Sequence, residues 1–291
     1  MKYAINNWVY NDEPIRETFD RLSRFGYDGV ELKGEPSLYD IDEIKSLIQE
    51  FNMAVTSVLG WTIWGIPGRD LSSPDEEERK AAVKFLKEVV DFSIQVGAPI
   101  LLVLPFPAGR TTPTGDPQSE ENWISIAETE WKNAVDSVQQ VSTYALDHDL
   151  TLAVEPINRF ETYQLTTADK ALKFIQEVGA GNVKLNLDSY HMNIDESDPA
   201  EAILRSGDYL VHMHVAGSNR QSPGSGHTDF VGLFKALKAV DFQGTVALEP
   251  VPPGADPGMA IKLSANLPLR DEYAKDGIAY LRDIEAAIAG Q

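Results

Sequence analysis

Four side chains able to bind a metal ion end short runs of the chain that are otherwise mostly apolar. Glu155 and Glu249 each follow such a run, and each precedes a proline. Asp188 and His214 end two further runs that lie between them in the sequence. A carboxylate at the end of a buried run must reach solvent or find a strong partner, because burying it unpaired costs several kcal/mol. We therefore expect these four side chains to meet at one rim and share a partner.

A divalent cation is the partner that this set of side chains favours. Three carboxylates gathered around one axis repel one another, and a cation between them removes that repulsion. Three carboxylates and one imidazole suit Mn²⁺, Mg²⁺ or Co²⁺ better than a structural zinc ion. We predict one bound ion, Mn²⁺ first, with Glu155, Asp188, His214 and Glu249 as ligands. The alternative is that one or two of these side chains only cap loops or join salt bridges.

Two other histidines receive different interpretations. His212 lies two residues before His214, so in a strand both rings point to the same side. We expect His212 to pack inside the fold or beside the metal ligands. His148 follows a helical pattern and is expected to be exposed, near the negative end of the helix dipole.

The rim requires parallel strands that end at the same edge, and the chain has the pattern for them. Short β-rich segments alternate with apolar residues at helical spacing from one end of the chain to the other. Gly26 and Gly179 are expected to end two of the helices. Eight strands are predicted: Lys2–Asn6, Gly29–Leu32, Ala54–Val58, Ile100–Leu104, Thr151–Glu155, Val183–Leu187, Leu210–His214 and Thr245–Glu249.

Eight strand–helix units without a long polar linker predict a single (β/α)₈ barrel that spans residues 1–291 as one domain. Active sites of such barrels lie at the C-terminal ends of the strands. The longest connections follow strands three, four, seven and eight, so all four lie on that face. These connections are Gly60–Asp75, Pro105–Asn122, Val215–Thr228 and Pro250–Arg270.

Composition excludes several classes of partner. The formal charge is −20, with 45 acidic against 25 basic residues, so the chain repels nucleic acids and anionic lipid surfaces. The absence of cysteine excludes disulfides and thiolate metal ligands. The N-terminus lacks the features of a signal peptide, and no apolar stretch approaches the ~20 residues of a membrane span. We expect a cytoplasmic protein with neither nucleic acid nor membrane as a partner.

Four segments of the chain resemble the ketose 3-epimerases of the xylose-isomerase-like superfamily, a group that acts on D-tagatose, D-psicose and L-ribulose. The segments read EPINRFETY from Glu155, LDSYHMNIDE from Leu187, HMHVAGSNRQSPGSGHTDF from His212 and ALEP from Ala247. The N-terminal half is similar mainly in its rhythm of strands and helices. The resemblance implies that Glu155, Asp188, His214 and Glu249 hold the metal, and that Glu161, His191 and Arg220 contact the substrate.

The chain also departs from the family pattern. The family usually has a Gly-Glu pair shortly after the metal-binding histidine, whereas this chain has Val215-Ala216-Gly217-Ser218. Aromatic residues after the early strands are predicted to wall a sugar pocket, because sugars pack readily on aromatic faces. These residues are Trp8, Tyr10, Trp61, Trp64 and Phe106, of which Trp8, Trp61 and Phe106 are expected to contact the substrate.

The reaction that the resemblance implies is epimerisation at C3 of a free ketose through a cis-enediolate. Inverting a carbon beside a carbonyl needs one group that removes a proton and another that returns a proton to the opposite face. Glu155 and Glu249 are predicted to fill these two roles. The substrate is a small sugar, and assembly as a homodimer or homotetramer is left open.

Other functions remain open at this point. An aldose–ketose isomerase similar to hydroxypyruvate isomerase would use the same metal chemistry at C1 and C2. An enediolate-forming lyase or dehydratase, similar to inosose dehydratase or to enzymes that cleave 3-oxo-glycosides, would expel a leaving group instead. An endonuclease-IV-like repair enzyme is disfavoured by the charge and by the small number of histidines. A binding protein without catalysis would require that no metal is bound.

Overall fold

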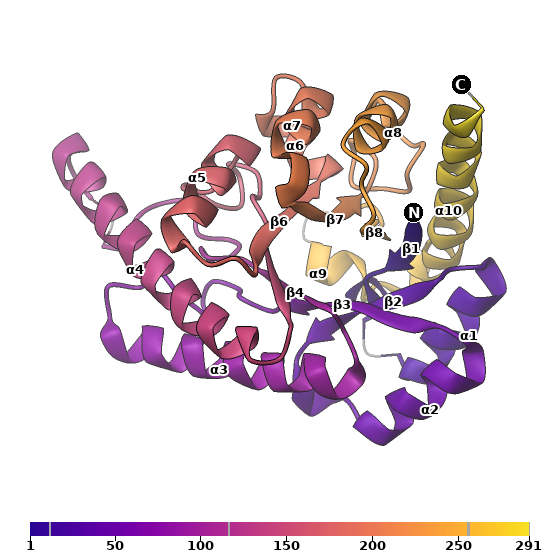
Figure 1. Ribbon diagram of the computed structural model, residues 1–291, viewed down its shortest axis with the longest axis horizontal. Helices are drawn as coiled ribbons and strands as arrows, with labels where there is room; N and C mark the ends of the chain where they lie inside the picture. Colours follow the sequence, from indigo (N-terminus) through magenta and orange to yellow (C-terminus); the bar gives the residue numbers. More distant parts are fainter. Residues whose placement is uncertain (12, 116, 255–256, 291) are drawn as a thin grey trace.

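Eight parallel strands form one sheet in a computed structural model that describes residues 1–11, 13–115, 117–254 and 257–290 (Figure 1). The order of hydrogen-bonded neighbours is β1-β8-β7-β6-β5-β4-β3-β2. An isolated parallel bridge between Asn6 and Glu31 joins the two end strands. The sheet is therefore a nearly closed barrel, which confirms the predicted fold. Its strands are β1 (Lys2–Ile5), β2 (Gly29–Gly34), β3 (Ala54–Gly60), β4 (Ile100–Val103), β5 (Thr151–Val154), β6 (Val183–Asp188), β7 (Leu210–Val215) and β8 (Thr245–Leu248).

All eight predicted strands are present, with ends that differ from the prediction by one or two residues. The glutamates after β5 and β8 lie one residue beyond the assigned strands. Their backbones nevertheless continue the sheet, because Glu155 donates its N–H to Val103 O at 3.1 Å and Glu249 donates to Val215 O at 3.0 Å. Both side chains are thus held at the rim by strand hydrogen bonds.

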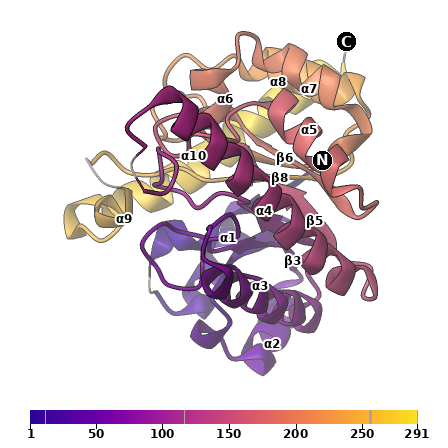
Figure 2. The same cartoon turned by 90° about the vertical axis from the view of Figure 1, so that its left-hand side faces the viewer.

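Helices cover the outside of the barrel, and each strand is followed by at least one of them (Figures 1 and 2). The C-terminal helix packs against both α1 and α8, so it lies between these two helices on the outside of the barrel. The helices are α1 (Ile15–Phe25), α2 (Ile41–Phe51), α3 (Glu76–Val96), α4 (Glu120–Leu146), α5 (Ala168–Val178), α6 (Ser189–Asp195), α7 (Pro199–Ser206), α8 (Phe230–Ala239), α9 (Pro257–Ala260) and α10 (Leu267–Ala289), with short 3₁₀ turns at Asn7–Tyr10, Pro36–Leu38, Gly207–Tyr209 and Ser264–Asn266.

Local sequence explains where these helices end and which side they bury. Gly26 and Gly179 end α1 and α5 with φ angles of 80° and 70°, a conformation that glycine adopts without a steric cost, as predicted. Helix α1 buries Phe19 and Leu22 against the barrel. None of the helices in the described part of the chain is both long and apolar enough to cross a membrane.

In the described part of the chain the buried apolar side chains form three clusters. Most buried apolar side chains lie in one continuous cluster. A separate small cluster consists of Leu59, Leu102 and Ala153, and both Trp8 and Trp61 pack against it. The two tryptophans therefore rest on a fixed apolar base.

The long predicted connections do follow the C-terminal ends of β3, β4, β7 and β8. The last one differs from the prediction, because Pro250–Arg270 contains α9 and a 3₁₀ turn, and α10 already begins at Leu267. Residue 116 of the connection Pro105–Asn122 and residues 255–256 of Pro250–Arg270 lie outside the described residues.

Candidate metal centre and active site

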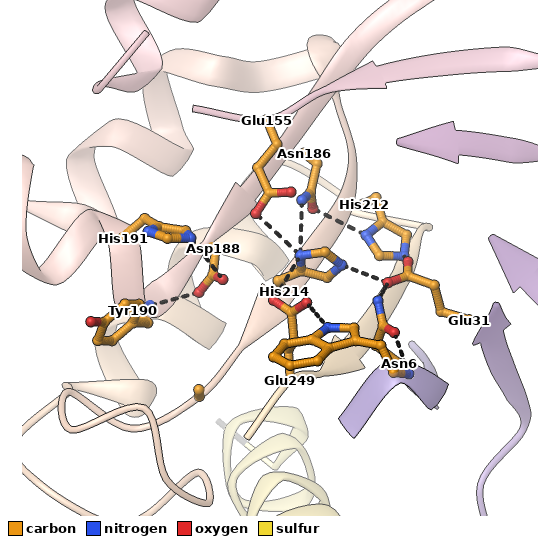
Figure 3. Close-up of polar contacts among 12 residues, drawn as sticks. Asn6, Glu31, Glu155, Asn186, Asp188, Tyr190, His191, His212, His214 and Glu249 are labelled. Atoms are coloured by element: carbon orange, nitrogen blue, oxygen red, sulfur yellow. Dashed lines mark hydrogen bonds and ion pairs between the residues drawn. The ribbon is translucent and has the colours of Figure 1, made fainter. Parts of the chain in front are cut away.

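The four predicted metal ligands meet at the rim of the barrel. Glu155, Asp188, His214 and Glu249 each offer one ligand atom, and these atoms all lie within 4.8 Å of one another. Figure 3 shows the four side chains converging from neighbouring strands. Asp188 and His214 are fully buried, and the two glutamates are 4% and 5% exposed.

The two nitrogens of the His214 ring face different groups. Nδ1 lies 3.2 Å from Glu155 Oε1 and 3.5 Å from Glu249 Oε2. Nε2 lies 2.9 Å from Oε1 of Glu31, a glutamate on β2 (Figure 3). In the neutral ring with its proton on Nε2, donated to Glu31, Nδ1 carries a lone pair that points toward Glu155 and Glu249.

Glu31 is the residue of this site that sequence reasoning missed. Its carboxylate is fully buried and accepts hydrogen bonds from Asn6 Nδ2 and Ser57 Oγ, both at 2.6 Å. Burial alone would raise the pKa of Glu31, but His214 and His212 beside it lower that pKa to about 2. A signal was available, since Glu31 is a charged residue within the predicted strand Gly29–Leu32, between Val30 and Leu32.

His212 lies below the four ligands, inside the barrel, as the sequence predicted. Its Nδ1 lies 3.0 Å from Asn186 Oδ1, and its Nε2 lies 3.1 Å from Ser57 Oγ and 3.3 Å from Glu31 Oε2. Burial lowers the pKa of His212 to about 3, so this ring is neutral. His148 is exposed at the end of α4, also as predicted.

The donor set fits a divalent cation. Three carboxylates and one imidazole in so small a volume carry more negative charge than a buried site holds without a positive partner. In the chain itself this charge is balanced by Arg220, which donates to Asp188 Oδ2 and Glu249 Oε2. It is also balanced by His214: burial disfavours the charged ring, but Glu31, Glu155 and Glu249 raise the pKa of His214 well above its ordinary value. An oxygen-rich set with one nitrogen is typical of Mn²⁺ and related hard ions.

A cavity of about 830 Å³ opens above this centre. Glu155 and Glu249 line it, whereas Asp188 and His214 lie beneath and do not. The two glutamates thus have one side toward the other ligands and one side toward the cavity. The predicted substrate contacts Trp8, Trp61, Glu161, His191 and Arg220 also line the cavity. The structure therefore brings them together with the predicted metal ligands.

The three aromatic side chains predicted to contact the substrate lie in different surroundings. Trp8 donates its indole N–H to Glu249 Oε1 at 2.5 Å, and its ring lies 6.1 Å from that of Trp61. Phe106 is 2% exposed and packs against Trp131 and Phe174 in the core. It does not line the cavity, so its placement disagrees with the predicted substrate contact. Its ring is buried instead among the aromatic rings of Trp131, Tyr163 and Phe174.

Short elements after β5 and β6 position His191 and Glu161. Asp188 caps the N-terminus of α6, which places His191 in the first turn of that helix. His191 Nδ1 accepts the backbone N–H of Asn158 at 3.1 Å, which leaves Nε2 3.7 Å from Asp188. Glu161 accepts a hydrogen bond from Asn158 Nδ2 at 3.0 Å. Arg159 forms its ion pair with Asp195 and not with Glu161.

The loop after β7 holds Arg220. Arg220 adopts a left-handed backbone with φ 61°, and its guanidinium lies 4.7 Å from the centre of the Tyr190 ring. The loop departs from the family pattern at Ala216, which is fully buried. Its backbone N–H and carbonyl both hydrogen-bond the hydroxyl of Ser189, at 3.0 and 2.8 Å. The loop is therefore fastened to the start of α6 without an acidic side chain.

Comparison with known proteins identifies the family of this chain. The profile described as xylose isomerase-like TIM barrel matches residues 19–284. The 3-dehydro-D-guloside 4-epimerase of Escherichia coli K12 is 30% identical over 268 residues, which cover 90% of this chain and 97% of that protein. The L-ribulose 3-epimerase of Methylomonas sp. DH-1 is 31% identical over 80% of this chain and 77% of its own length.

A solved structure of a relative has the same fold. The D-allulose 3-epimerase from Methylomonas sp., in complex with D-allulose, superposes with a TM-score of 0.78 and 28% identity, over 97% of this chain and 96% of that one. These relatives are named as carbohydrate epimerases. With the barrel, the rim site and a profile match over most of its length, this chain belongs to the xylose isomerase-like TIM barrel family.

Proposed function

We propose that this chain is a divalent-metal-dependent epimerase that inverts C3 of a free ketose. One observation carries the proposal: Glu155 and Glu249 both line the cavity and both lie within 3.5 Å of the same nitrogen of His214. The two carboxylates therefore flank one position in the cavity above His214. Proton exchange at a single carbon requires two such groups, one to remove the proton and one to return it. The names of the relatives support a sugar ketone as the substrate.

In the proposed reaction one glutamate removes the proton from C3. The C3–H bond breaks, its electron pair forms the C2–C3 double bond, and negative charge develops on the oxygen at C2. The other glutamate then donates a proton to the opposite face of C3, and the C2 carbonyl forms again with C3 inverted. Each glutamate serves as the base in one direction and as the acid in the other.

The remaining groups hold the substrate. Arg220 is a planar donor beside the cavity and can bind the sugar oxygens next to the reacting carbon. His191 and Glu161 line the same wall and can orient the hydroxyls further along the chain. A divalent ion held by the four ligands, Mn²⁺ first with Mg²⁺ and Co²⁺ as alternatives, would supply positive charge that stabilises the enediolate oxygens.

Deuterium incorporation tests the proposed carbon directly. The protein is incubated with Mn²⁺ and D-fructose, D-psicose or D-tagatose in D₂O, and the sugars are analysed by NMR. We expect deuterium at C3 together with the C3 epimer. An aldose product with deuterium at C2, or recovered ketose with deuterium at C1, would indicate the aldose–ketose isomerase instead, and loss of water or of a substituent would indicate a lyase.

Variants of the two glutamates test their role. Glu155→Gln and Glu249→Gln each remove a proton-transfer group, so we expect turnover to fall by about 10³-fold or more. Glu88→Gln, on the exposed side of α3, is the matched control and should keep parental activity. Parental turnover in either rim variant would contradict the mechanism.

A second candidate is epimerisation at C4 of a 3-dehydro-glycoside. It is favoured by the relative from Escherichia coli, whose name states a 3-dehydro-D-guloside and whose length is matched almost completely. The same two glutamates would act on C4, which also adjoins a ketone. Deuterium incorporation at C4 of such a glycoside would support this second function over C3 epimerisation of a free ketose. Location in the cytoplasm and assembly as a homodimer or homotetramer stay predictions from the sequence.

A further inference from the structure

The cavity above the metal ligands is larger than a free sugar needs. A hexose has twelve heavy atoms, and even if each took the roughly 30 Å³ of a water molecule in the liquid, the sugar would occupy about 360 Å³. The cavity measures about 830 Å³. The cavity is open to solvent on one side and offers more room than one monosaccharide at the centre fills.

A row of side chains leads from the centre into this extra space. Trp8 is hydrogen-bonded to Glu249, the ring of Trp61 follows at 6.1 Å, and the ammonium of Lys33 lies 4.3 Å from the centre of the Trp61 ring. All of these side chains line the cavity. Tryptophan faces of this kind bind sugar rings and other flat or apolar groups. The row thus forms a wall that extends outward from the reacting position.

Lys33 is placed on this wall by its strand. It lies two residues after Glu31 on β2, so both side chains point into the barrel, with Lys33 nearer the C-terminal rim. The residue is half-buried. Among the described residues no carboxylate lies within 4.0 Å of its ammonium, although many other cations of this acidic chain are paired. Lys262, the other lysine at the cavity, is exposed to solvent instead.

A partly buried ammonium without a counter-ion favours an anion, because its hydration is reduced and the ring beside it replaces only part of that hydration. One lysine matches a single negative charge. A group with two negative charges would meet stronger repulsion from the carboxylates at the centre and from the net charge of −20. A carboxylate is therefore the anion that this position suits best.

We infer that Lys33 and Trp61 form a distal subsite for a carboxylate carried on a substituent of the sugar, so that the substrate class is glycosides bearing an acidic group. The inference rests on the proposed function, since it takes the reacting sugar to lie above Glu155 and Glu249. Trp61 packs against the substituent, and Lys33 donates hydrogen bonds to its carboxylate.

Binding of two matched disaccharide derivatives tests the subsite. Maltobionate and maltitol differ only in a carboxylate in place of a CH₂OH group, and their binding to the protein with Mn²⁺ is measured by calorimetry. We expect maltobionate to bind about 10- to 100-fold more tightly, the range of a charge-assisted hydrogen bond. In Lys33→Met this ratio should fall to within about threefold of unity. Lys33→Gln, which keeps a polar side chain, gives the same test if Lys33→Met folds poorly.

Lys45→Met is the matched control, because it removes one exposed lysine of α2 outside the cavity. The control should keep the parental preference for maltobionate. Two results would overturn the inference: no measurable preference in the parent, or a preference that survives in both Lys33 variants, which would place the carboxylate at the metal instead. Binding requires no turnover, so a failure of the proposed epimerase reaction is recognised separately, by the absence of deuterium exchange.

Discussion

Replacement of Glu31 by glutamine tests whether Glu31 supports the candidate metal centre through its hydrogen bond to His214. Glu31 is not among the four predicted ligands, yet its Oε1 lies 2.9 Å from Nε2 of His214. Glutamine keeps the shape of the side chain. Its amide oxygen can still accept from His214 and Asn6, and its NH₂ group can face Ser57, whose hydroxyl can turn to accept. The substitution therefore removes the negative charge while the buried hydrogen bonds persist.

The size of the effect follows from what this charge does to His214. A carboxylate that accepts the Nε2 proton fixes the ring orientation and makes Nδ1 a stronger electron donor to a metal. Loss of such a supporting group typically weakens metal binding by about 10- to 100-fold, equivalent to about 1.4–2.8 kcal/mol. We expect Glu31→Gln to weaken Mn²⁺ binding within this range, with turnover at saturating Mn²⁺ reduced less than affinity.

Calorimetric titration of the metal-free protein with Mn²⁺ measures this affinity, and thermal unfolding without metal establishes that the variant is folded. Ser57→Ala is the control, because it removes one hydrogen bond to Glu31 and leaves the charge; its Mn²⁺ affinity should fall less than about threefold. A folded Glu31→Gln protein with parental Mn²⁺ affinity would refute the supporting role of Glu31.

Two further predictions concern the loops around the cavity. Arg110 is buried and ion-paired with Glu130 at 3.0 Å and with Asp70 at 3.5 Å, so Arg110→Met leaves two buried carboxylates without their cation. We expect a loss of about 3–5 kcal/mol in the free energy of unfolding by urea, and a loss below 1 kcal/mol would contradict the buried network. A Cβ added at Gly217 would lie 2.2 Å from the carbonyl oxygen of Ser225, so Gly217→Ala should shift the loop that carries Arg220. The KM of the variant for the ketose should rise several-fold, and an unaltered KM would show that the loop tolerates the methyl group.

The fold and the four rim residues were predictable because their signals are local. Strand and helix periods alternate along the whole chain, and each of the four side chains stands directly at the end of its strand. Parallel strands of a barrel bring such positions to one rim whatever the details of packing. Predicting that these four residues meet therefore required only the order of the strands and their parallel direction.

The remaining features depend on contacts between distant parts of the chain. Glu31 reaches His214 across the barrel, and the two residues are 183 positions apart in sequence. The orientation of Phe106 was not predictable, because an aromatic residue three positions after a strand can turn toward the cavity or toward the helices. Its burial against Trp131 and Phe174 is decided by the packing of α4 and α5 on the barrel. The position of Lys33 beside the Trp61 ring was likewise not predictable, because the two residues lie on different strand ends and meet only in the folded chain.

The most direct test of the central claim is to locate the ion. Crystals grown or soaked with Mn²⁺ are measured at a wavelength where manganese scatters anomalously, and the positions of the peaks are determined. We predict one peak per chain, bounded by Glu155, Asp188, His214 and Glu249. A peak within the second cluster that the structure holds, between Glu31, His212 and His214, would contradict the account, as would crystals without any peak at the rim.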